Sequence, residues 1–224
     1  MPAPRPTRLF HITAIANVPR ICEVGGLVSK NAGEAAGVTY QNIAHATVQR
    51  LRVGRAVPDP PGGWIHDFVP FYFAPRSPML YAINSGRVDG CVWRQADIVH
   101  LETTVEAVVA AGLPYVFYDR NASLQYSVPY TTVAHLDSAV AWDLLTERPV
   151  LDGFCQYWQN RADNPRYVAR MEQRQAEFLA KNHVPLEVFT RMGVMNAQKQ
   201  AEVQSLLAAA GVNLRVDVKR DWYF

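Results

Sequence analysis

The sequence lacks a long apolar run and a leader segment. Its longest apolar stretch, Val105–Phe117, is interrupted by Glu106, Gly112 and Pro114, so it is too short to cross a bilayer. The opening MPAPRPTRLF has neither the apolar core nor the small-residue cleavage site of an export signal. We therefore expect no membrane association and a cytoplasmic location.

The number of cysteines and the net charge are also low. Cys22, Cys91 and Cys155 are far apart and form no CxxC or Cys/His pattern, which indicates core thiols in a reducing compartment and no metal site. The 22 Lys and Arg against 20 Asp and Glu leave a net charge of +2, too small to indicate nucleic-acid binding by itself. The motifs of Rossmann proteins, P-loop proteins, zincins and α/β-hydrolases are missing as well.

The composition of the 224 residues is that of a folded protein. Hydrophobic residues make up 49% and charged residues 19%, which excludes wholesale disorder. No repeat, low-complexity tract or linker divides the chain, so we expect residues 1–224 to form a single domain. Short strands and helices alternate irregularly, which predicts an α+β fold with a mixed, mostly antiparallel central sheet and flanking helices.

Local signals place several elements. Asn17 is expected to cap a helix that starts at Val18 and ends at Gly25-Gly26. Thr103 and Glu106 form a capping box that predicts a helix through Ala111. The other predicted elements are strands over Leu9–Thr13, Ile98–Leu101, Tyr115–Tyr118, Val188–Met195 and Val212–Val218, and a helix over Ala197–Ala210.

Two segments read as loops. Val53–Gly63 is rich in Pro and Gly, which predicts a surface turn. Asp119–Arg174 is irregular and rich in aromatic residues, and a long irregular segment inside a compact domain is often functional.

Three strings contain candidate binding or catalytic residues. His11 and Thr13 share one face of the first strand, where both could bind a ligand, although a half-buried structural histidine is the simpler interpretation of His11 alone. Tyr72 lies opposite Phe71 and Phe73, an arrangement that suits a ring facing a cleft but also ordinary core packing. Glu177 is a carboxylate on an apolar strand, next to Gln175 on the same face, and is either a site residue or a surface residue at a sheet edge.

Two groups of arginines could contact phosphates. The stretch from Val48 to Arg55 is locally basic, and Arg166, Arg170 and Arg174 at a spacing of four could form a stripe along one helix face. For either group alone, a solvated surface is the simpler interpretation.

Taken in order, these strings resemble the DarT-type DNA ADP-ribosyltransferase toxins. The matching pieces are FHITAIANVPRICEVGGLVSKN, VQRLR, PPGGWIHDFVPFYFAPRSPMLYAI, VFYDRNAS and RQAEFLAKNHVP, which run from Phe10 to Pro185, and the closing RVDVKRDWYF. The resemblance implies an ADP-ribosyltransferase fold, NAD+ as co-substrate and thymine in single-stranded DNA as acceptor. It also implies a toxin of a toxin–antitoxin pair, whose macrodomain antitoxin removes the modification. We expect the protein to be a monomer.

The resemblance also implies roles for individual residues. Glu177 takes the place of the catalytic glutamate, and Arg52 that of the second arginine of a catalytic pair. Asn31–Gly54 corresponds to the NAD-binding element, and Asp119–Glu177 to the turn-turn loop that reads DNA. The implied contacts to NAD+ are His11, Ile12, Thr13, Arg20, Val28, Arg52 and Tyr72, and the implied contacts to DNA are Arg120, Tyr126, Arg166, Arg170 and Arg174.

Three positions depart from the family pattern. Leu51 replaces the first arginine of the pair, Arg120 replaces a glycine, and Arg20 stands where a small residue is expected. The changes at Leu51 and Arg120 bear on base and sequence preference rather than on the reaction.

The chemistry of the reaction agrees with these residue types. Breaking the nicotinamide–ribose bond places positive charge on the ribose, which the Glu177 carboxylate would stabilise while Tyr72 stacks on the nicotinamide. Arg52 would either take the proton from the base or, because a guanidinium is normally locked in its charged form, bind phosphates or stabilise the base anion. The alternatives are an ADP-ribosyltransferase that acts on guanosine, RNA or protein, and a catalytically inactive module that binds single strands.

Overall fold

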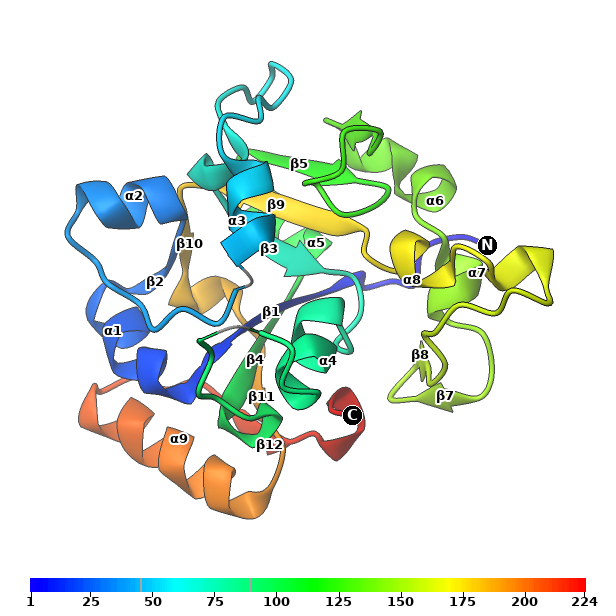
Figure 1. Cartoon of the computed structure of the whole chain (residues 1–224). Coiled ribbons are helices and arrows are strands. Elements are labelled where there is room, and N and C mark those ends of the chain that lie inside the picture. The colour runs from blue at the N-terminus through cyan, green and yellow to red at the C-terminus, as the bar shows by residue number, and fades with distance from the viewer. Residues whose placement is uncertain (45, 89) are drawn as a thin grey trace.

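A mixed sheet is the centre of the computed structural model, which describes residues 1–44, 46–88 and 90–224 (Figure 1). In the described residues its eight strands follow the order β12-β11-β4-β1-β3-β9-β5-β6. Neighbouring strands are antiparallel except β11 and β12, which are parallel. Their bounds are β1 Arg8–Ala14, β3 Phe68–Tyr72, β4 Ile98–Thr104, β5 Tyr115–Tyr118, β6 Pro129–Tyr130, β9 Glu177–Lys181, β11 Arg191–Val194 and β12 Val216–Val218.

Two groups of short elements flank the sheet on opposite sides in Figure 1. One side holds α1 (Val18–Glu23), α2 (Lys30–Ala35), α3 (Ala46–Arg52) and a small pair of strands, β2 (Gly26–Val28) and β10 (His183–Pro185). The other holds α6 (Leu136–Ala139), α7 (Trp142–Leu145), α8 (Arg170–Gln173) and the hairpin of β7 (Val150–Leu151) and β8 (Phe154–Cys155). The remaining helices are α4 (Pro78–Asn84), α5 (Val105–Ala110) and α9 (Ala197–Ala209).

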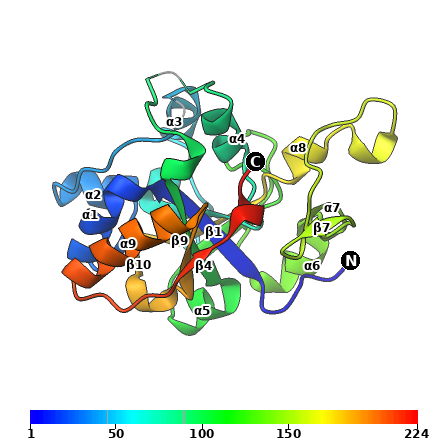
Figure 2. The ribbon, with the colours of Figure 1, turned by 90° about the horizontal axis from the view of Figure 1, so that it is seen from below.

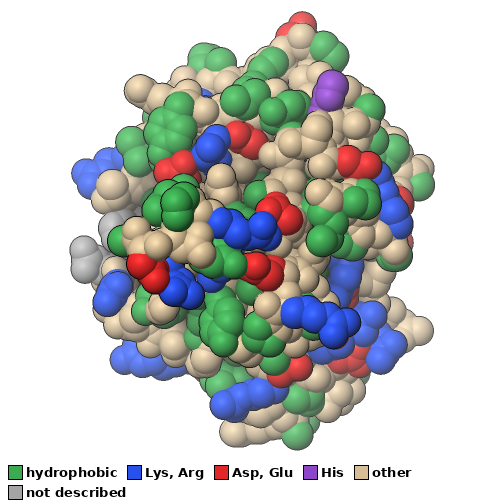
Figure 3. Space-filling view, turned by 90° about the vertical axis from the view of Figure 1, so that its right-hand side faces the viewer, with side chains coloured by type: hydrophobic (Ala, Val, Ile, Leu, Met, Phe, Trp, Pro, Cys, Tyr) green, Lys and Arg blue, Asp and Glu red, His purple; other side chains and the backbone are tan. Residues whose placement is uncertain are grey.

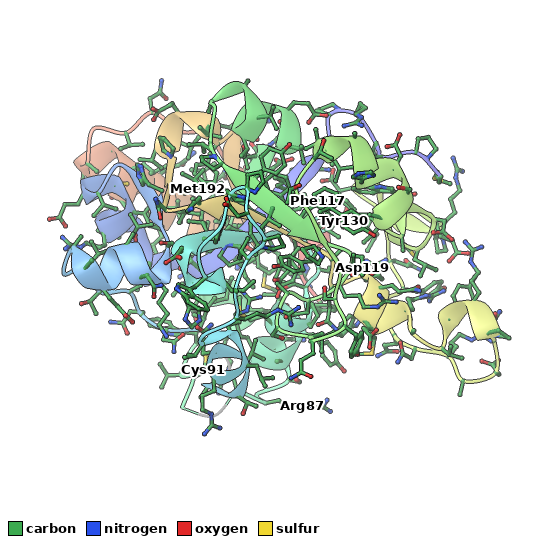
Figure 4. The ribbon with its side chains drawn as sticks, turned by 90° about the horizontal axis from the view of Figure 1, so that it is seen from above. Arg87, Cys91, Phe117, Asp119, Tyr130 and Met192 are labelled. Atoms are coloured by element: carbon green, nitrogen blue, oxygen red, sulfur yellow. The ribbon has the colours of Figure 1, made fainter. Side chains whose placement is uncertain are left out.

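Aromatic side chains fix the second group to the sheet. Phe73, just after β3, meets Trp142 of α7 edge to face with ring centroids 5.3 Å apart, and both are buried. Phe117 of β5 stacks on Tyr130 of β6 at 5.1 Å, and Asp119 follows at the end of β5 (Figure 4). Edge-to-face and offset pairs of this kind add to the burial of apolar area. The irregular Asp119–Arg174 segment is therefore built of short elements that are packed firmly at its start.

A charged contact holds the β7–β8 hairpin against the first strand. The Arg8 guanidinium donates to Asp152 Oδ2 at 2.9 Å and lies over the rings of Phe10, Phe154 and Trp222. The Trp222 indole donates to the same carboxylate at 2.7 Å. The C-terminal turn and the hairpin are thereby joined at β1.

The predicted α+β class, with a mostly antiparallel sheet, is confirmed. The helix at Val18 and the final strand–helix–strand passage are present with shorter bounds. Each has a local cause: Pro19 suits a first helical turn, and Asn196 caps α9 by accepting from the Lys199 N–H.

The helix predicted through Ala111 is present as α5, but the residues assigned to its capping box are wrong. Thr104, not Thr103, caps α5 by accepting from the Ala107 N–H at 3.0 Å, because β4 continues through Thr104. The Glu106 carboxylate instead accepts from the Thr7 N–H at 2.9 Å, and the Thr103 hydroxyl donates to the Val188 carbonyl. Both side chains serve tertiary contacts that the local pattern does not contain.

The three cysteines are free thiols, as expected, but only Cys155 is fully buried. Cys91 is half-buried and lies with Arg87 at the edge of the molecule in Figure 4. No helix in the described ranges is long and apolar enough to cross a membrane.

Candidate active site

A cavity of about 970 Å³ opens at the middle of the sheet. Residues of β1, β3 and β9 form one wall, and residues 37–44 and 46–49 with parts of α1, α2 and β2 form the other. The volume is at the upper end of the range for small-molecule and cofactor sites. The cavity brings together His11, Ile12, Thr13, Val28, Arg52, Tyr72 and Glu177, seven of the residues proposed for NAD+ binding or catalysis.

Glu177 and Arg52 form a buried ion pair at the cavity wall. Arg52 Nη2 lies 2.6 Å from Glu177 Oε1 and 2.5 Å from Oε2, and the two residues are 7% and 1% exposed. The glutamate begins β9, while the arginine ends α3 in the segment that covers the cavity. A charge at this depth needs a partner, since its desolvation is otherwise uncompensated. The pair therefore fixes both charges at the cavity.

Further donors surround the Glu177 carboxylate. Asn121 Nδ2 donates to Oε1 at 3.1 Å and the Ala122 N–H to Oε2 at 3.3 Å, both from the turn after β5. The Tyr72 hydroxyl also donates to it, from the position directly opposite Glu177 in the β3–β9 ladder. Three separate segments thus hold this one side chain, which is the preorganisation that electrostatic catalysis requires.

The protonation equilibria of this cluster are shifted. Burial raises the pKa of the Glu177 carboxyl, and the Arg52 charge, the Ala122 N–H and the Tyr72 hydroxyl oppose part of that shift. Burial and the neighbouring Glu177 charge raise the pKa of the Tyr72 phenol, so Tyr72 stays a neutral donor. Shifted groups in a cleft are typical of functional sites.

His11 faces the cavity as a neutral ring. Burial lowers its pKa to about 4, against a smaller opposing effect of its hydrogen bond to the Pro70 carbonyl. Because Nδ1 lies 2.8 Å from that carbonyl oxygen, which can only accept, Nδ1 carries the proton. Nε2 is then an acceptor, suited to an amide N–H or a hydroxyl of a ligand.

Thr13 is tied to the covering segment through Asn17. Asn17 Nδ2 donates to Thr13 Oγ1 at 2.9 Å and to the Gln41 carbonyl at 3.0 Å, and its Oδ1 accepts from the Gln41 N–H at 2.6 Å. Asn17 is 3% exposed and lines the cavity. Its side chain does not cap α1 as expected, because these three bonds use it fully.

The residues that cover the cavity from the side opposite the sheet belong to the predicted NAD-binding element, Asn31–Gly54. Arg20, expected to contact NAD+, is not among the described residues that line the cavity. Its guanidinium pairs with Glu23 and donates weakly to the Gly37 carbonyl at 3.4 Å, so it acts on the element from outside. His45, within this element, lies outside the described residues.

The turn that holds Glu177 also carries two predicted DNA contacts. Arg120 pairs with Asp119 and Glu172, and its guanidinium lies 5.9 Å from the ring centroid of Tyr126. The Tyr126 hydroxyl donates to Glu172 at 2.7 Å, and the side chain is 59% exposed. An exposed ring next to a guanidinium, with Arg120 adjacent in sequence to the Asn121 that donates to Glu177, suits a platform for a base.

The predicted stripe of three arginines is wrong. Residues 165–167 form a 3-10 turn and α8 starts only at Arg170, so no single helix face carries all three. Arg170 and Arg174 are each 4% exposed; Arg170 pairs with Glu147 and stacks on Tyr167, and Arg174 donates to the Leu144 carbonyl. Only Arg166 is exposed, and acidic and basic side chains alternate on the face shown in Figure 3.

Sequence reasoning missed two polar residues of the site. Asn17 was assigned to a helix cap, and Asn121 carried no assignment although it stands in the VFYDRNAS string that the resemblance used. The signal that points to both is the need of the Glu177 carboxylate and the Thr13 hydroxyl for hydrogen-bond partners. In the described part of the chain, no three His, Cys, Asp or Glu side chains gather as metal ligands would.

Comparison with solved structures defines the class as an ADP-ribosyltransferase. The chain is similar to Thermus sp. 2.9 DarT in complex with ADP-ribosylated single-stranded DNA, with a TM-score of 0.85, 34% identity and coverage of 100% of this chain and 99% of that one. It is also similar to the same DarT in complex with NAD+, with a TM-score of 0.80, 33% identity and coverage of 99% and 100%.

The sequence comparisons identify the family. Residues 10–224 match the model described as "ssDNA thymidine ADP-ribosyltransferase, DarT", and the chain belongs to this family. A DNA ADP-ribosyl transferase of Thermus aquaticus is 36% identical over 223 residues, which cover 99% of this chain and 90% of that protein. The expected family and its NAD-dependent DNA ADP-ribosyltransferase activity are thereby confirmed.

Proposed function

We propose that this protein, as one domain and a monomer in the cytoplasm, transfers ADP-ribose from NAD+ to thymidine in single-stranded DNA with Glu177 and Arg52 as its catalytic residues. The observation that carries the proposal is the buried Arg52–Glu177 pair in the wall of a 970 Å³ cavity. All the groups required come from one chain, which supports a monomer.

The donor site fits NAD+. NAD+ supplies an ADP-ribosyl group when its nicotinamide–ribose bond breaks. His11 and Thr13 both line the cavity. His11 Nε2 is an acceptor suited to the carboxamide of NAD+. The Thr13 hydroxyl is held in a fixed orientation and is suited to a ribose hydroxyl. Val28 and Ile12 add apolar wall, and Tyr72 offers its ring face to the nicotinamide while its hydroxyl holds Glu177.

Glu177 stabilises the positive charge that develops on the ribose. Its oxygens are fixed by the Asn121, Ala122 and Arg52 donors before any ligand arrives, so little reorganisation is needed during the reaction. A carboxylate of this kind contributes about 10²–10³ in rate when the charge it faces exists mainly in the transition state.

Arg52 acts electrostatically rather than as a base. Its Nη2 lies against the Glu177 carboxylate, and an arginine guanidinium is not deprotonated in proteins. Its Nε is buried and has no partner in the described residues, so it can donate to a phosphate or to a carbonyl oxygen of the thymine. A ring nitrogen of the base forms the new bond to the ribose carbon, nicotinamide leaves with the electrons of the broken bond, and the N–H proton of the base passes to solvent.

The acceptor strand approaches over the turn that carries Arg120 and Tyr126. The exposed Tyr126 ring provides a stacking surface, and Arg166 is the one exposed cation of the three predicted in the adjoining segment. Stacking contributes ~1–3 kcal/mol per base in single-strand binding, so a protein with a net charge of only +2 can bind single-stranded DNA.

We further propose that the protein is the toxin of a toxin–antitoxin pair with a macrodomain antitoxin. Modified template bases would block replication, so toxicity should depend on catalysis. Expression of wild type in bacteria should stop growth, Glu177→Gln should relieve this, and co-expressed macrodomain with hydrolase activity should restore growth of the wild type.

The test of the proposed function uses labelled NAD+ with separate pools of DNA, RNA and protein, followed by mass spectrometry of short oligonucleotides of each base. Label should enter single-stranded DNA at thymidine only. Label in guanosine, RNA or protein would overturn the acceptor assignment, and binding of oligonucleotides without NAD+ consumption would overturn the enzymatic one.

A further inference from the structure

A second cavity, of about 460 Å³, lies outside the NAD+ site. It is formed where the C-terminus meets α4 and α8, which Figure 2 shows side by side. Its wall is aromatic: Tyr81 lies 4.9 Å from Trp158 and 5.2 Å from Phe224 between ring centroids. Tyr157, next to the buried Trp158, is 54% exposed at the same cavity.

Cations and amides complete the lining. Arg148 is exposed, and within the described ranges it makes no ion pair. Arg161 forms an ion pair with the exposed Asp163. Among the described residues of the lining, Glu147 has the one acidic side chain, and Arg166 and Arg170 neutralise it. The amide side chains in the lining are Gln156, Gln159 and Asn160.

Two elements connect this cavity to the active site. Tyr81 of α4 lines the second cavity, while Pro78, Met79 and Ala82 of the same helix line the first. Arg170 at the start of α8 lines the second cavity, and Gln175, just beyond that helix, lines the first. The walls of the two cavities therefore share α4 and the region of α8.

Resting on the proposed function, we infer that the second cavity binds nucleotides of the substrate strand a few positions from the modified base. A nucleotide presents a planar base and an anionic phosphate. The exposed Tyr157 ring supplies a stacking surface and Arg148 an unpaired cation, the combination that single-strand binding uses. The amides of Gln159 and Asn160 lie beside them and suit polar base edges.

The inference is tested by the length of the oligonucleotide. Wild type should modify an oligonucleotide that reaches the second cavity with a lower KM than one confined to the acceptor and its immediate neighbours. Tyr157→Ala and Arg148→Ala should each raise the KM for the long oligonucleotide about fivefold or more and leave the short one unchanged. Arg148→Ala should also reduce the salt slope of binding by about 0.7, the value for one phosphate contact on a single strand.

Three matched variants isolate the cause. Tyr157→Phe keeps the ring and Arg148→Lys keeps the charge, so both should stay close to wild type. Arg215→Ala removes an arginine that is 66% exposed elsewhere on the surface, and should change neither KM. Equal KM values of wild type for the two lengths, or an unchanged length dependence in Tyr157→Ala and Arg148→Ala, would overturn the inference. Failure of the proposed function looks different, since wild type would then modify no oligonucleotide of either length.

Discussion

Arg52 and Glu177 are 125 positions apart in the chain, yet one guanidinium nitrogen of Arg52 contacts both carboxylate oxygens of Glu177. The contact joins α3, which covers the cavity, to β9 in the central sheet. Breaking a buried pair by removing one partner costs about 3–5 kcal/mol, because the other charge is left uncompensated. The pair therefore serves stability as well as the catalytic role proposed for it, and variants of either residue need a stability measurement beside the rate.

Glu177→Gln should lower DNA modification by at least about 10²-fold, because the amide keeps the size of the side chain but cannot oppose the charge on the ribose. It should also lower the melting temperature, since Arg52 keeps its charge without a counterion. Modification rates and thermal unfolding of the purified variant check both effects.

Glu187→Gln is the control, because Glu187 is an exposed carboxylate away from the cavity. Its rate and melting temperature should match wild type. A Glu177→Gln enzyme that retains more than about a tenth of the wild-type rate would contradict the role of the carboxylate in the transition state.

Tyr72→Phe should move the acid limb of the pH–rate profile to higher pH. The Tyr72 hydroxyl donates to Glu177 and lowers the pKa of that carboxyl, which burial has raised. Glu177 must be ionised to act, so activity appears as pH rises through its pKa, and loss of the donor raises that pKa further. The measurement is kcat/KM against pH for both proteins.

The ring of Tyr72 is kept in this variant, so stacking on nicotinamide is unchanged and the shift reports the hydroxyl alone. Tyr115→Phe removes another hydroxyl, which accepts from the Val133 N–H away from the site, and should leave the profile in place. An acid limb that stays at its wild-type pH in Tyr72→Phe would show that the hydroxyl does not act on Glu177.

Much of the site follows from local sequence, and the rest depends on tertiary contacts. Alternation along a strand places His11 and Thr13 at the cavity and Phe71 away from it, as predicted. Glu177 is identifiable as a carboxylate in an apolar strand. The bonds of Asn17 to Gln41 and of Asn121 to Glu177 join segments 24 and 56 residues apart, and no local pattern encodes them.

The arginines show the same limit. A spacing of four predicts one helix face, but Pro165 and the turn at 165–167 prevent a continuous helix. Arg170 donates to Glu147 and Arg174 donates to the Leu144 carbonyl, and these contacts keep both arginines buried. Spacing determines a face only where the helix exists. The resemblance to a family identified the reaction, whereas burial decides which arginines remain available to DNA.

His100 should make the fold sensitive to acid. Burial lowers its pKa to about 4, while an unfolded histidine has the ordinary value of 6.5. The unfolded state therefore binds the proton more strongly, so stability is fully present above pH 6.5 and falls as pH decreases toward 4, by on the order of 3 kcal/mol. Urea unfolding at several pH values measures this loss.

His100→Gln should reduce the decline to about half, because His11, whose pKa burial also lowers to about 4, still titrates. Glutamine does not titrate, and its amide can still donate to the Pro75 carbonyl, as Nε2 does at 3.0 Å. His135→Gln should follow wild type, since His135 is exposed. If wild type and His100→Gln lose stability in parallel between pH 6.5 and 4, the buried histidine is not the cause.

Asn17→Ala should raise the KM for NAD+ about tenfold with a smaller change in kcat. The variant loses the bonds that orient the Thr13 hydroxyl and tie the segment at Gln41 over the cavity, and each such bond contributes about 0.5–1.5 kcal/mol. Glu177 and Arg52 are not touched, so the chemical step is largely spared once NAD+ is bound.

Asn196→Ala is the matched control, because Asn196 caps α9 away from the cavity. This variant should lower the stability by about 1 kcal/mol without changing the KM for NAD+. A fall in kcat with an unchanged KM in Asn17→Ala would mean that Asn17 supports catalysis rather than the closure of the NAD+ site.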